Sequence, residues 1–228
     1  MRKFYFIIIL TLIIGCDVVT VEKYYTLAFE LEQQERYEEA ISFHDKALKK
    51  NSKFRPSLIN RGVDKSALGD YNGAISDYKK ILEFDSDNLL AMMNIGNNYE
   101  SLNDFKSAIK YYSKALESKQ VIKSSKFNIR IEYQNDFDKD YQYQVNDYEL
   151  LFERGTAYLL DNQYEKAISD LRELIKTREM VGDAYFYIGE SYLGLNDTLN
   201  ACKNYKISVE KGVSNGRENI KKYCKEKW

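Results

Sequence analysis

The sequence predicts an all-α solenoid of five helix pairs, with a carboxyl-terminal capping helix and one insert between the third and fourth pairs. Two columns of small residues carry this prediction, because both recur at intervals of 34, 34, 59 and 34 residues. A fixed repeat of this length is typical of stacked, similar units. The chain has 228 residues, is 44% hydrophobic and 30% charged, and contains one proline, as a folded protein does. The columns are Ala28, Gly62, Gly96, Gly155 and Gly189, and Ala40, Ala74, Ala108, Ala167 and Ala201.

The second unit shows why each repeat forms two helices. Residues 58–65 have the i, i+3, i+4, i+7 spacing of a helix face, the run LGDY interrupts it, and residues 74–82 form a second face. Gly62 opposite Ala74 lets the two axes approach closely. Helices of about thirteen residues are marginal alone, so each pair must stack on a neighbour.

Two aromatic columns extend the pattern, and together with the small residues they resemble the tetratricopeptide repeat. The resemblance implies antiparallel helix pairs that stack into a right-handed superhelix. The closing proline of that family is absent from all five units, and Thr198 replaces the aromatic residue of the fifth. The columns are Tyr37, Tyr71, Phe105 and Tyr164, and Tyr78, Tyr112 and Tyr205, with His44 and Leu171 as exceptions in the second.

The unit boundaries follow from these columns. We expect repeats one to three over residues 21–122, an insert over 123–147, repeats four and five over 148–215, and a capping helix over 216–228. Alternation of apolar residues at 127–133 and 141–145 predicts a β-hairpin in the insert. The alternative is an extension of the flanking helices with a disordered tip.

The amino terminus, MRKFYFIIILTLIIGC, has the layout of a signal peptide: two cations, a short apolar run, then Gly15 and Cys16. The apolar run is too short to span a bilayer. The letters IIGC resemble the lipobox of bacterial lipoproteins, which implies removal of residues 1–15, lipidation of Cys16 and a tether over 16–20. The alternatives are a plain signal peptide cut elsewhere and a buried strand. We expect a protein of the bacterial cell envelope, facing away from the cytoplasm, with the inner or outer membrane left open.

Composition and motifs exclude several classes of function. A net charge of −1 gives no basic surplus for nucleic acid. The single histidine, His44, lies in a packing column and is read as a core residue, and the cysteines do not have zinc-finger spacing. No glycine-rich phosphate-binding motif occurs. We therefore expect no catalytic residue, no metal and no cofactor.

The first helices predict a binding groove. Their faces turned away from the partner helices carry large apolar groups and several carboxylates, including Glu100 and Glu153, but no lysine or arginine in that register. Such a groove favours a protein or peptide segment that carries positive charge. The alternative is that neighbouring first helices bury these side chains against one another. The predicted groove residues are Tyr25, Phe29, Ile59, Val63, Met93, Asn94, Asn97, Phe152, Thr156, Phe186 and Glu190.

The sequence thus predicts a membrane-tethered scaffold that binds a protein partner in its groove. The alternative function is a structural subunit of an envelope assembly or secretion complex that uses its outer edges and insert.

Comparison of the repeats with one another predicts two ion pairs. Arg61 and Arg154 share a column that is apolar in the other units, and only their units carry an aspartate sixteen residues later, Asp77 and Asp170. A partly buried guanidinium needs a charged, bidentate partner, so we expect each arginine to pair with its own aspartate.

The two remaining cysteines lie on surfaces that the repeat pattern brings together. Cys202 takes a position that is isoleucine in the other units and packs on the following helix, and Cys224 lies on the apolar face of that helix. An oxidising compartment permits a disulfide between them. The alternative is two buried thiols.

Overall fold

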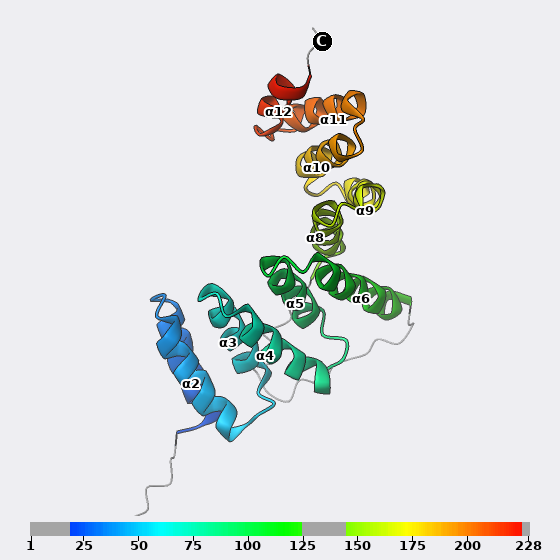
Figure 1. Ribbon diagram of the computed structural model, residues 1–228. Coiled ribbons are helices and arrows are strands. Elements are labelled where there is room, and N and C mark those ends of the chain that lie inside the picture. Colours follow the sequence, from blue (N-terminus) through cyan, green and yellow to red (C-terminus); the bar gives the residue numbers. More distant parts are fainter. Residues whose placement is uncertain (1–18, 125–144, 225–228) are drawn as a thin grey trace, which may run out of the picture.

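The computed structural model describes residues 19–124 and 145–224, which form eleven α-helices and no strands (Figure 1). Consecutive helices pack as antiparallel pairs that stack along a curved axis, so the predicted all-α solenoid is confirmed. The helices are α1 (Val21–Glu32), α2 (Tyr37–Lys50), α3 (Arg55–Ala67), α4 (Tyr71–Phe84), α5 (Leu89–Ser101), α6 (Phe105–Ser124), α8 (Asp147–Leu160), α9 (Tyr164–Lys176), α10 (Val181–Gly194), α11 (Thr198–Glu210) and α12 (Gly216–Tyr223).

The turn inside each pair has the same backbone in all five repeats. One residue adopts a left-handed conformation, with φ between 57° and 81°, and it is glycine or asparagine in four repeats. These two residue types tolerate that conformation best. In the second repeat Asp70 follows Gly69 and caps α4, since its carboxylate accepts from the amide of Gly73 at 2.9 Å. The five left-handed residues are Glu35, Gly69, Asn103, Asn162 and Asn196.

Within a pair, the column of small residues provides room for a ring. A Cβ added to Gly62 would lie 2.6 Å from Cζ of Tyr78, and one added to Gly96 would lie 2.3 Å from Cε1 of Tyr112. Both tyrosines are almost completely buried. The glycines therefore let the second-helix ring lie directly on the backbone of the first helix.

The ends of the insert depart slightly from the predicted bounds. Helix α6 continues to Ser124, so residues 123 and 124 are helical, and α8 begins at Asp147 because Asn146 and Glu149 form a capping box. Lys119 ties the two ends together: its ammonium donates to the carbonyl of Val145 and pairs with Asp147 at 2.9 Å. The predicted hairpin falls mainly on residues 125–144, outside the described residues.

The capping helix α12 packs on α11 and ends at Tyr223, shorter than the predicted range of 216–228. Residues 225–228 and the whole signal and lipobox segment, Cys16 included, lie outside the described residues. Across 19–124 and 145–224, no helix combines the length and apolar character that a membrane span requires.

Candidate functional site: the groove

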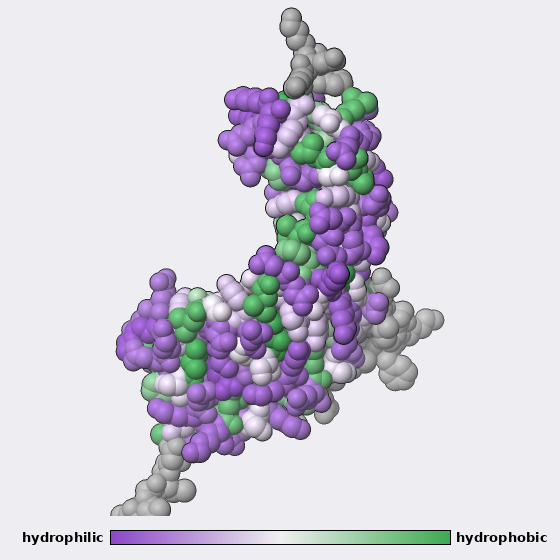
Figure 2. Space-filling model, in the orientation of Figure 1, coloured by the Kyte–Doolittle hydropathy of each residue, from purple (hydrophilic) through white to green (hydrophobic). Residues whose placement is uncertain are grey.

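The groove is the surface formed by the first helices of the pairs, α1, α3, α5, α8 and α10, on the side away from their partner helices. Helix α1 contacts α3, and α8 contacts both α5 and α10, so these helices form an inner layer. Figure 1 shows α5 and α8 on the inner side of the bend, with α6 and α9 outside. Figure 2 shows the surface hollowed there, with apolar side chains among polar ones.

The amino-terminal part of the predicted groove separates into exposed and buried side chains. Phe29 and Val63 are 46% and 48% exposed and are available to a ligand. Tyr25 and Ile59 are only 8% and 4% exposed and belong to the core around Phe54, so their assignment to the groove is corrected. The rings of Tyr25 and Phe54 meet edge to face at 5.9 Å. Contact between α1 and α3 buries these positions, as the alternative interpretation of the stripe stated.

The middle of the groove carries partly buried side chains whose polar groups are mostly engaged within the protein. Asn97 accepts a hydrogen bond from the Tyr112 hydroxyl at 2.7 Å, and the hydroxyl of Thr156 donates to carbonyls of its own helix. Met93 packs against the core of repeat three. Asn94 is also partly buried, and its backbone carbonyl accepts a hydrogen bond from the side chain of Asn98. These residues shape the groove more than they offer free hydrogen-bonding groups.

Toward the carboxyl end an aromatic patch forms on α8 and α10. Phe152 meets Tyr187 edge to face with ring centroids 5.5 Å apart, and Phe186 lies 5.3 Å from Tyr187 and 5.9 Å from Tyr205. Phe152, Phe186 and Tyr187 are partly buried, so each ring keeps some surface open. Tyr205 donates its hydroxyl to Glu190 at 2.7 Å, which fixes that carboxylate at the edge of the patch.

Two partly buried carboxylates lie on neighbouring first helices, Glu100 on α5 and Glu153 on α8, and the charge of Glu153 acts on Tyr187 of the patch. Burial, and then the charge of Glu153, raises the pKa of Glu100 to about 7. Burial, and then Glu149, raises the pKa of Glu153. Oε1 of Glu100 is buried and accepts no hydrogen bond. Within the described residues no ion pair reaches either carboxylate, so this part of the groove holds negative charge without a cation.

More carboxylates act on the same face. The pKa of Tyr187 is raised by burial and then by Asp183, Glu153 and Glu190, in that order. Carboxylates from α8 and α10 therefore act together on the aromatic patch, and Glu153 also acts on Glu100 of α5. Such a surface attracts a positively charged group and offers rings against which it can lie.

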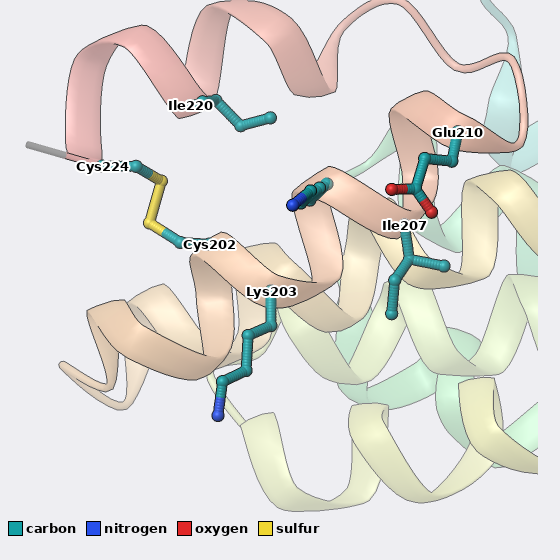
Figure 3. Close-up of a pocket in the computed structure, with 7 residues that line it drawn as sticks. Cys202, Lys203, Ile207, Glu210, Ile220 and Cys224 are labelled. Carbon is teal, nitrogen blue, oxygen red and sulfur yellow. A yellow bond between two sulfur atoms is a disulfide. The ribbon is translucent and has the colours of Figure 1, made fainter. Parts of the chain in front are cut away.

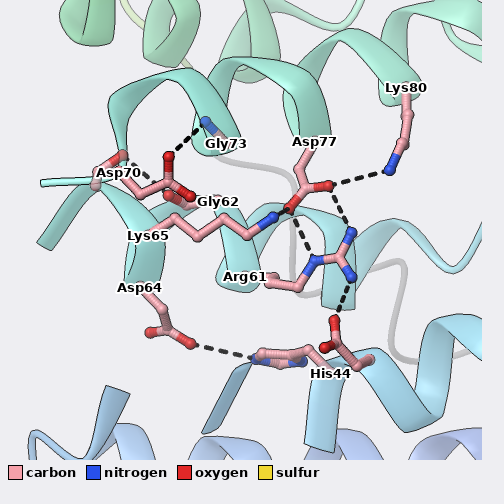
Figure 4. A network of polar contacts seen from close by, with 11 residues as sticks. His44, Arg61, Gly62, Asp64, Lys65, Asp70, Gly73, Asp77 and Lys80 are labelled. Atoms are coloured by element: carbon pink, nitrogen blue, oxygen red, sulfur yellow. Dashed lines mark hydrogen bonds and ion pairs between the residues drawn. The ribbon is translucent and has the colours of Figure 1, made fainter. Parts of the chain in front are cut away.

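The two predicted arginine–aspartate pairs are present between the helices of repeats two and four. Arg61 Nε and Nη2 donate to Asp77 at 2.8 and 2.5 Å (Figure 4). Arg154 Nε and Nη2 donate to Asp170 at 2.7 and 2.9 Å. Asp77 is completely buried and also accepts from Lys65 at 2.7 Å.

Each arginine also reaches the preceding repeat. Arg61 Nη1 donates to Asp45 on α2 at 2.5 Å, and Arg154 Nη1 donates to Ser113 on α6 at 3.1 Å. Asp45 and Ser113 occupy the same position of their repeats. The arginines therefore hold neighbouring repeats together as well as their own helix pair.

The predicted disulfide joins α11 to the end of α12. Cys202 and Cys224 are bonded, with their Cα atoms 5.9 Å apart. The bond forms one wall of a pocket of about 610 Å³ between the two helices (Figure 3). Ile207 and Ile220 supply apolar surface there, and Lys203, Lys206 and Glu210 lie at its edge. This pocket lies on a second helix and the cap, and is therefore separate from the groove.

His44 is completely buried, as a core residue is, but its surroundings were not predicted. Its Nε2 lies 2.7 Å from Glu32 Oε1. The same atom lies 3.8 Å from Asp64 Oδ2 (Figure 4). Burial, and then the charge of Glu32, raises the pKa of Asp64 to about 7. The sequence held one signal of this cluster, a histidine in a column that is otherwise tyrosine or leucine.

Family models match three of the five repeats that the sequence suggested. Models described as tetratricopeptide repeat match residues 90–121, 149–177 and 183–211, which correspond to repeats three, four and five. A search of curated proteins finds no match.

Solved structures share the fold at low sequence identity. The structure titled "Crystal structure of YrrB: a TPR protein with an unusual peptide-binding site" is 18% identical, with a TM-score of 0.68, and the match covers 90% of this chain and 94% of that one. MamA from Desulfovibrio magneticus RS-1 is 16% identical, with a TM-score of 0.67, and the match covers 83% and 93%. PilW, titled a "widely conserved type IV pilus biogenesis factor", is 18% identical, with a TM-score of 0.60, and the match covers 83% and 78%.

Proposed function

We propose that this chain, a member of the tetratricopeptide repeat proteins, is a membrane-tethered scaffold that holds a positively charged segment of a protein partner in its groove. Acyl chains on Cys16 attach it to a membrane of the bacterial cell envelope, on a side that faces away from the cytoplasm. The scaffold acts by binding, and the proposal includes no catalytic step and no cofactor.

The observation that carries the proposal is the pair of carboxylates Glu100 and Glu153. Both are partly buried, their pKa values are raised by burial and by other carboxylates, and neither meets a cation among the described residues. An incoming lysine or arginine would relieve this repulsion and supply the hydrogen bond that Glu100 Oε1 lacks. Negative charge held in this way favours binding of a cation over binding of an anion.

The aromatic patch supplies the other half of the interaction. Tyr187 lies within reach of the charge of Glu153, and it contacts Phe152, and both rings keep part of their surface open. A cation over an aromatic face gains electrostatic attraction, and the methylene groups of a lysine or arginine pack on the same ring. The favoured segment therefore carries a basic residue with apolar neighbours. The exposed Phe29 and Val63 extend apolar surface toward the amino-terminal end of the groove.

The membrane tether is inferred from the amino-terminal sequence. A basic start, an apolar run of eleven residues from Phe4 to Ile14 and the letters GC form a signal that ends at a cysteine. Lipid on Cys16 would place the first repeat close to the membrane surface, because helix α1 begins at Val21.

Site-specific photocrosslinking in cells tests the groove. A photoreactive phenylalanine replaces Phe152 in the groove or, as a control, the exposed Ser169 on α9. We expect a crosslinked partner from position 152 that disappears when Glu100 and Glu153 are changed to lysine. Crosslinks from position 169 alone would refute groove binding and favour the structural-subunit alternative.

Labelling with an alkyne fatty acid tests the tether independently. We expect the wild-type chain to take up the label and sediment with membranes, and the Cys16→Ser variant to lose both properties. Equal labelling of the two proteins would contradict lipidation at Cys16.

A further inference from the structure

A cluster of metal-ligand side chains lies where the first repeat meets the second, apart from the residues that carry the groove proposal. Glu32 at the end of α1, His44 on α2 and Asp64 on α3 each offer one ligand atom, and these atoms lie within 4.8 Å of one another. The three residues come from three helices and two repeats, so any ion bound there would join those repeats.

Stacking of the repeats does not require these residue types. The corresponding positions of the next junction carry a hydroxyl, a phenol and an amide, and are neutral. There the serine hydroxyl lies 2.7 Å from the asparagine side-chain oxygen in a direct hydrogen bond. The first junction has replaced this neutral set by an imidazole and two carboxylates. The neutral set is Ser66, Tyr78 and Asn98.

One buried carboxylate oxygen of the cluster accepts no hydrogen bond. Asp64 is 1% exposed, and its Oδ2 atom makes no hydrogen bond although it lies 3.8 Å from His44 Nε2. Figure 4 shows its carboxyl group directed at the imidazole ring. A buried carboxylate oxygen in this position needs a proton or a cation near it, because burial without a partner is costly.

The second carboxylate is held in place by a neighbour. Asn60 Nδ2 donates to both oxygens of Glu32, at 3.2 and 2.9 Å, and His44 Nε2 lies 2.7 Å from Oε1. Hydrogen bonds of this kind orient a ligand before an ion binds. Glu32 keeps some exposure, so water and ions can reach the cluster from its side.

We propose that Glu32, His44 and Asp64 bind a divalent first-row transition metal ion, with Zn²⁺ as the representative. One imidazole nitrogen and two carboxylate oxygens suit such an ion better than Mg²⁺ or Ca²⁺, which prefer oxygen ligands alone. Two carboxylates balance the charge of the ion, and water from the exposed side of Glu32 supplies a fourth ligand.

Metal binding needs a free lone pair on Nε2 and ionised carboxylates, so any proton that these groups hold there leaves to solvent. The neutral ring then keeps its proton on Nδ1. Nδ1 is buried without an acceptor, so the site lacks the usual outer hydrogen bond on its histidine. We therefore expect an affinity about 10- to 100-fold below that of a site with such a bond.

Zn²⁺ titration against an indicator dye tests the proposal on the full chain, purified in detergent without a histidine tag. We expect wild type to bind one Zn²⁺ at a site that Asp64→Asn weakens at least 100-fold. A triple variant, Glu32→Ser, His44→Tyr and Asp64→Asn, copies the neutral junction and should fold without this site. Glu38→Gln removes an exposed carboxylate of α2 and should leave binding unchanged.

Thermal unfolding gives a second readout. Zn²⁺ should raise the Tm of wild type and of Glu38→Gln, and should not raise the Tm of the two variants that lack the site. Failure of wild type to bind, or equal binding by wild type and Asp64→Asn, would overturn the proposal. Neither result bears on the groove, whose carboxylates are unchanged in every variant.

Discussion

Substituting Gly62 by alanine tests whether close packing between helix and ring sets the geometry of a repeat. The added Cβ would lie 2.6 Å from Cζ and 2.8 Å from Cε1 of Tyr78, well inside contact distance. Tyr78 is 1% exposed, so its ring has no free space into which it can turn. The two helices must separate, or the ring must leave its position.

The expected magnitude combines two opposing effects. Overpacking a core costs about 1–3 kcal/mol, and the close contact with a fully buried ring places this case at about 2–3 kcal/mol, while alanine in place of glycine within a helix returns about 1 kcal/mol. We expect Gly62→Ala to lower the free energy of unfolding by about 1–2 kcal/mol. Gly155 offers a matched control, because its added Cβ would lie 3.1 Å from Cγ of Leu171, a contact that a small shift relieves. Gly155→Ala should therefore leave stability within about 0.5 kcal/mol of wild type.

Urea unfolding followed by circular dichroism measures both variants. A Tyr78→Leu background copies the Gly155 and Leu171 arrangement, and there the penalty of Gly62→Ala should largely disappear, since neighbouring substitutions are not additive. The first repeat already pairs Ala28 with the smaller ring of His44. Equal stability of Gly62→Ala and wild type, or an equal loss in Gly155→Ala, would refute the reasoning.

Three further predictions follow from the polar contacts and the disulfide. Arg61→Met should lower the free energy of unfolding by about 3 kcal/mol, because it removes a partner of the buried Asp77. Adding Asp77→Leu should recover most of this loss in a double-mutant cycle. Losses that simply add would contradict the pairing. Removing the disulfide between Cys202 and Cys224, which closes a loop of 22 residues, should destabilise the capping helix by about 3 kcal/mol. Amide hydrogen exchange should then become faster in α12 alone. Unchanged exchange would show that packing is sufficient to hold α12 in place. The fold raises the pKa of Glu100 from 4.5 to about 7, so its protonated form stabilises the fold fully below pH 4.5 and this contribution is lost as pH rises through 7. The Tm of Glu100→Gln should therefore rise relative to that of wild type between pH 5.5 and 8. Parallel curves of Tm against pH for the two proteins would contradict the burial of this carboxyl.

The interval of 34 residues was sufficient to predict the helix pairs. Within one pair, the helix period and the fixed spacing of the two helices decide which side chains face each other. The arginine–aspartate pairs were predictable for the same reason, since Arg61 and Asp77 lie on the two helices of one repeat. The contact of Arg61 with Asp45 was not, because it depends on how one repeat is rotated on the next. The same rotation buries Tyr25 and Ile59, which the stripe of first-helix residues assigned to the groove.

The sequence predicted the negative charge of the groove, but not which carboxylates come together there. The absence of lysine and arginine from the first-helix register indicated an acidic groove. The charge of Glu153 raises the pKa of Glu100 only because α5 stacks on α8, across the insert, and the sequence does not show that stacking. The cluster around His44 was missed because its ligands come from three helices.

Selection of random displayed peptides on the immobilised chain tests the central claim most directly. We predict that enriched peptides carry lysine or arginine beside apolar residues. Their affinity should fall with salt and should drop about 10- to 100-fold in a Glu100→Gln, Glu153→Gln variant, the range for losing one or two charged hydrogen bonds of about 1.5 kcal/mol each. The Asp45→Asn variant should bind like wild type. Enrichment of neutral or acidic peptides, or affinity unchanged by loss of both carboxylates, would contradict the account.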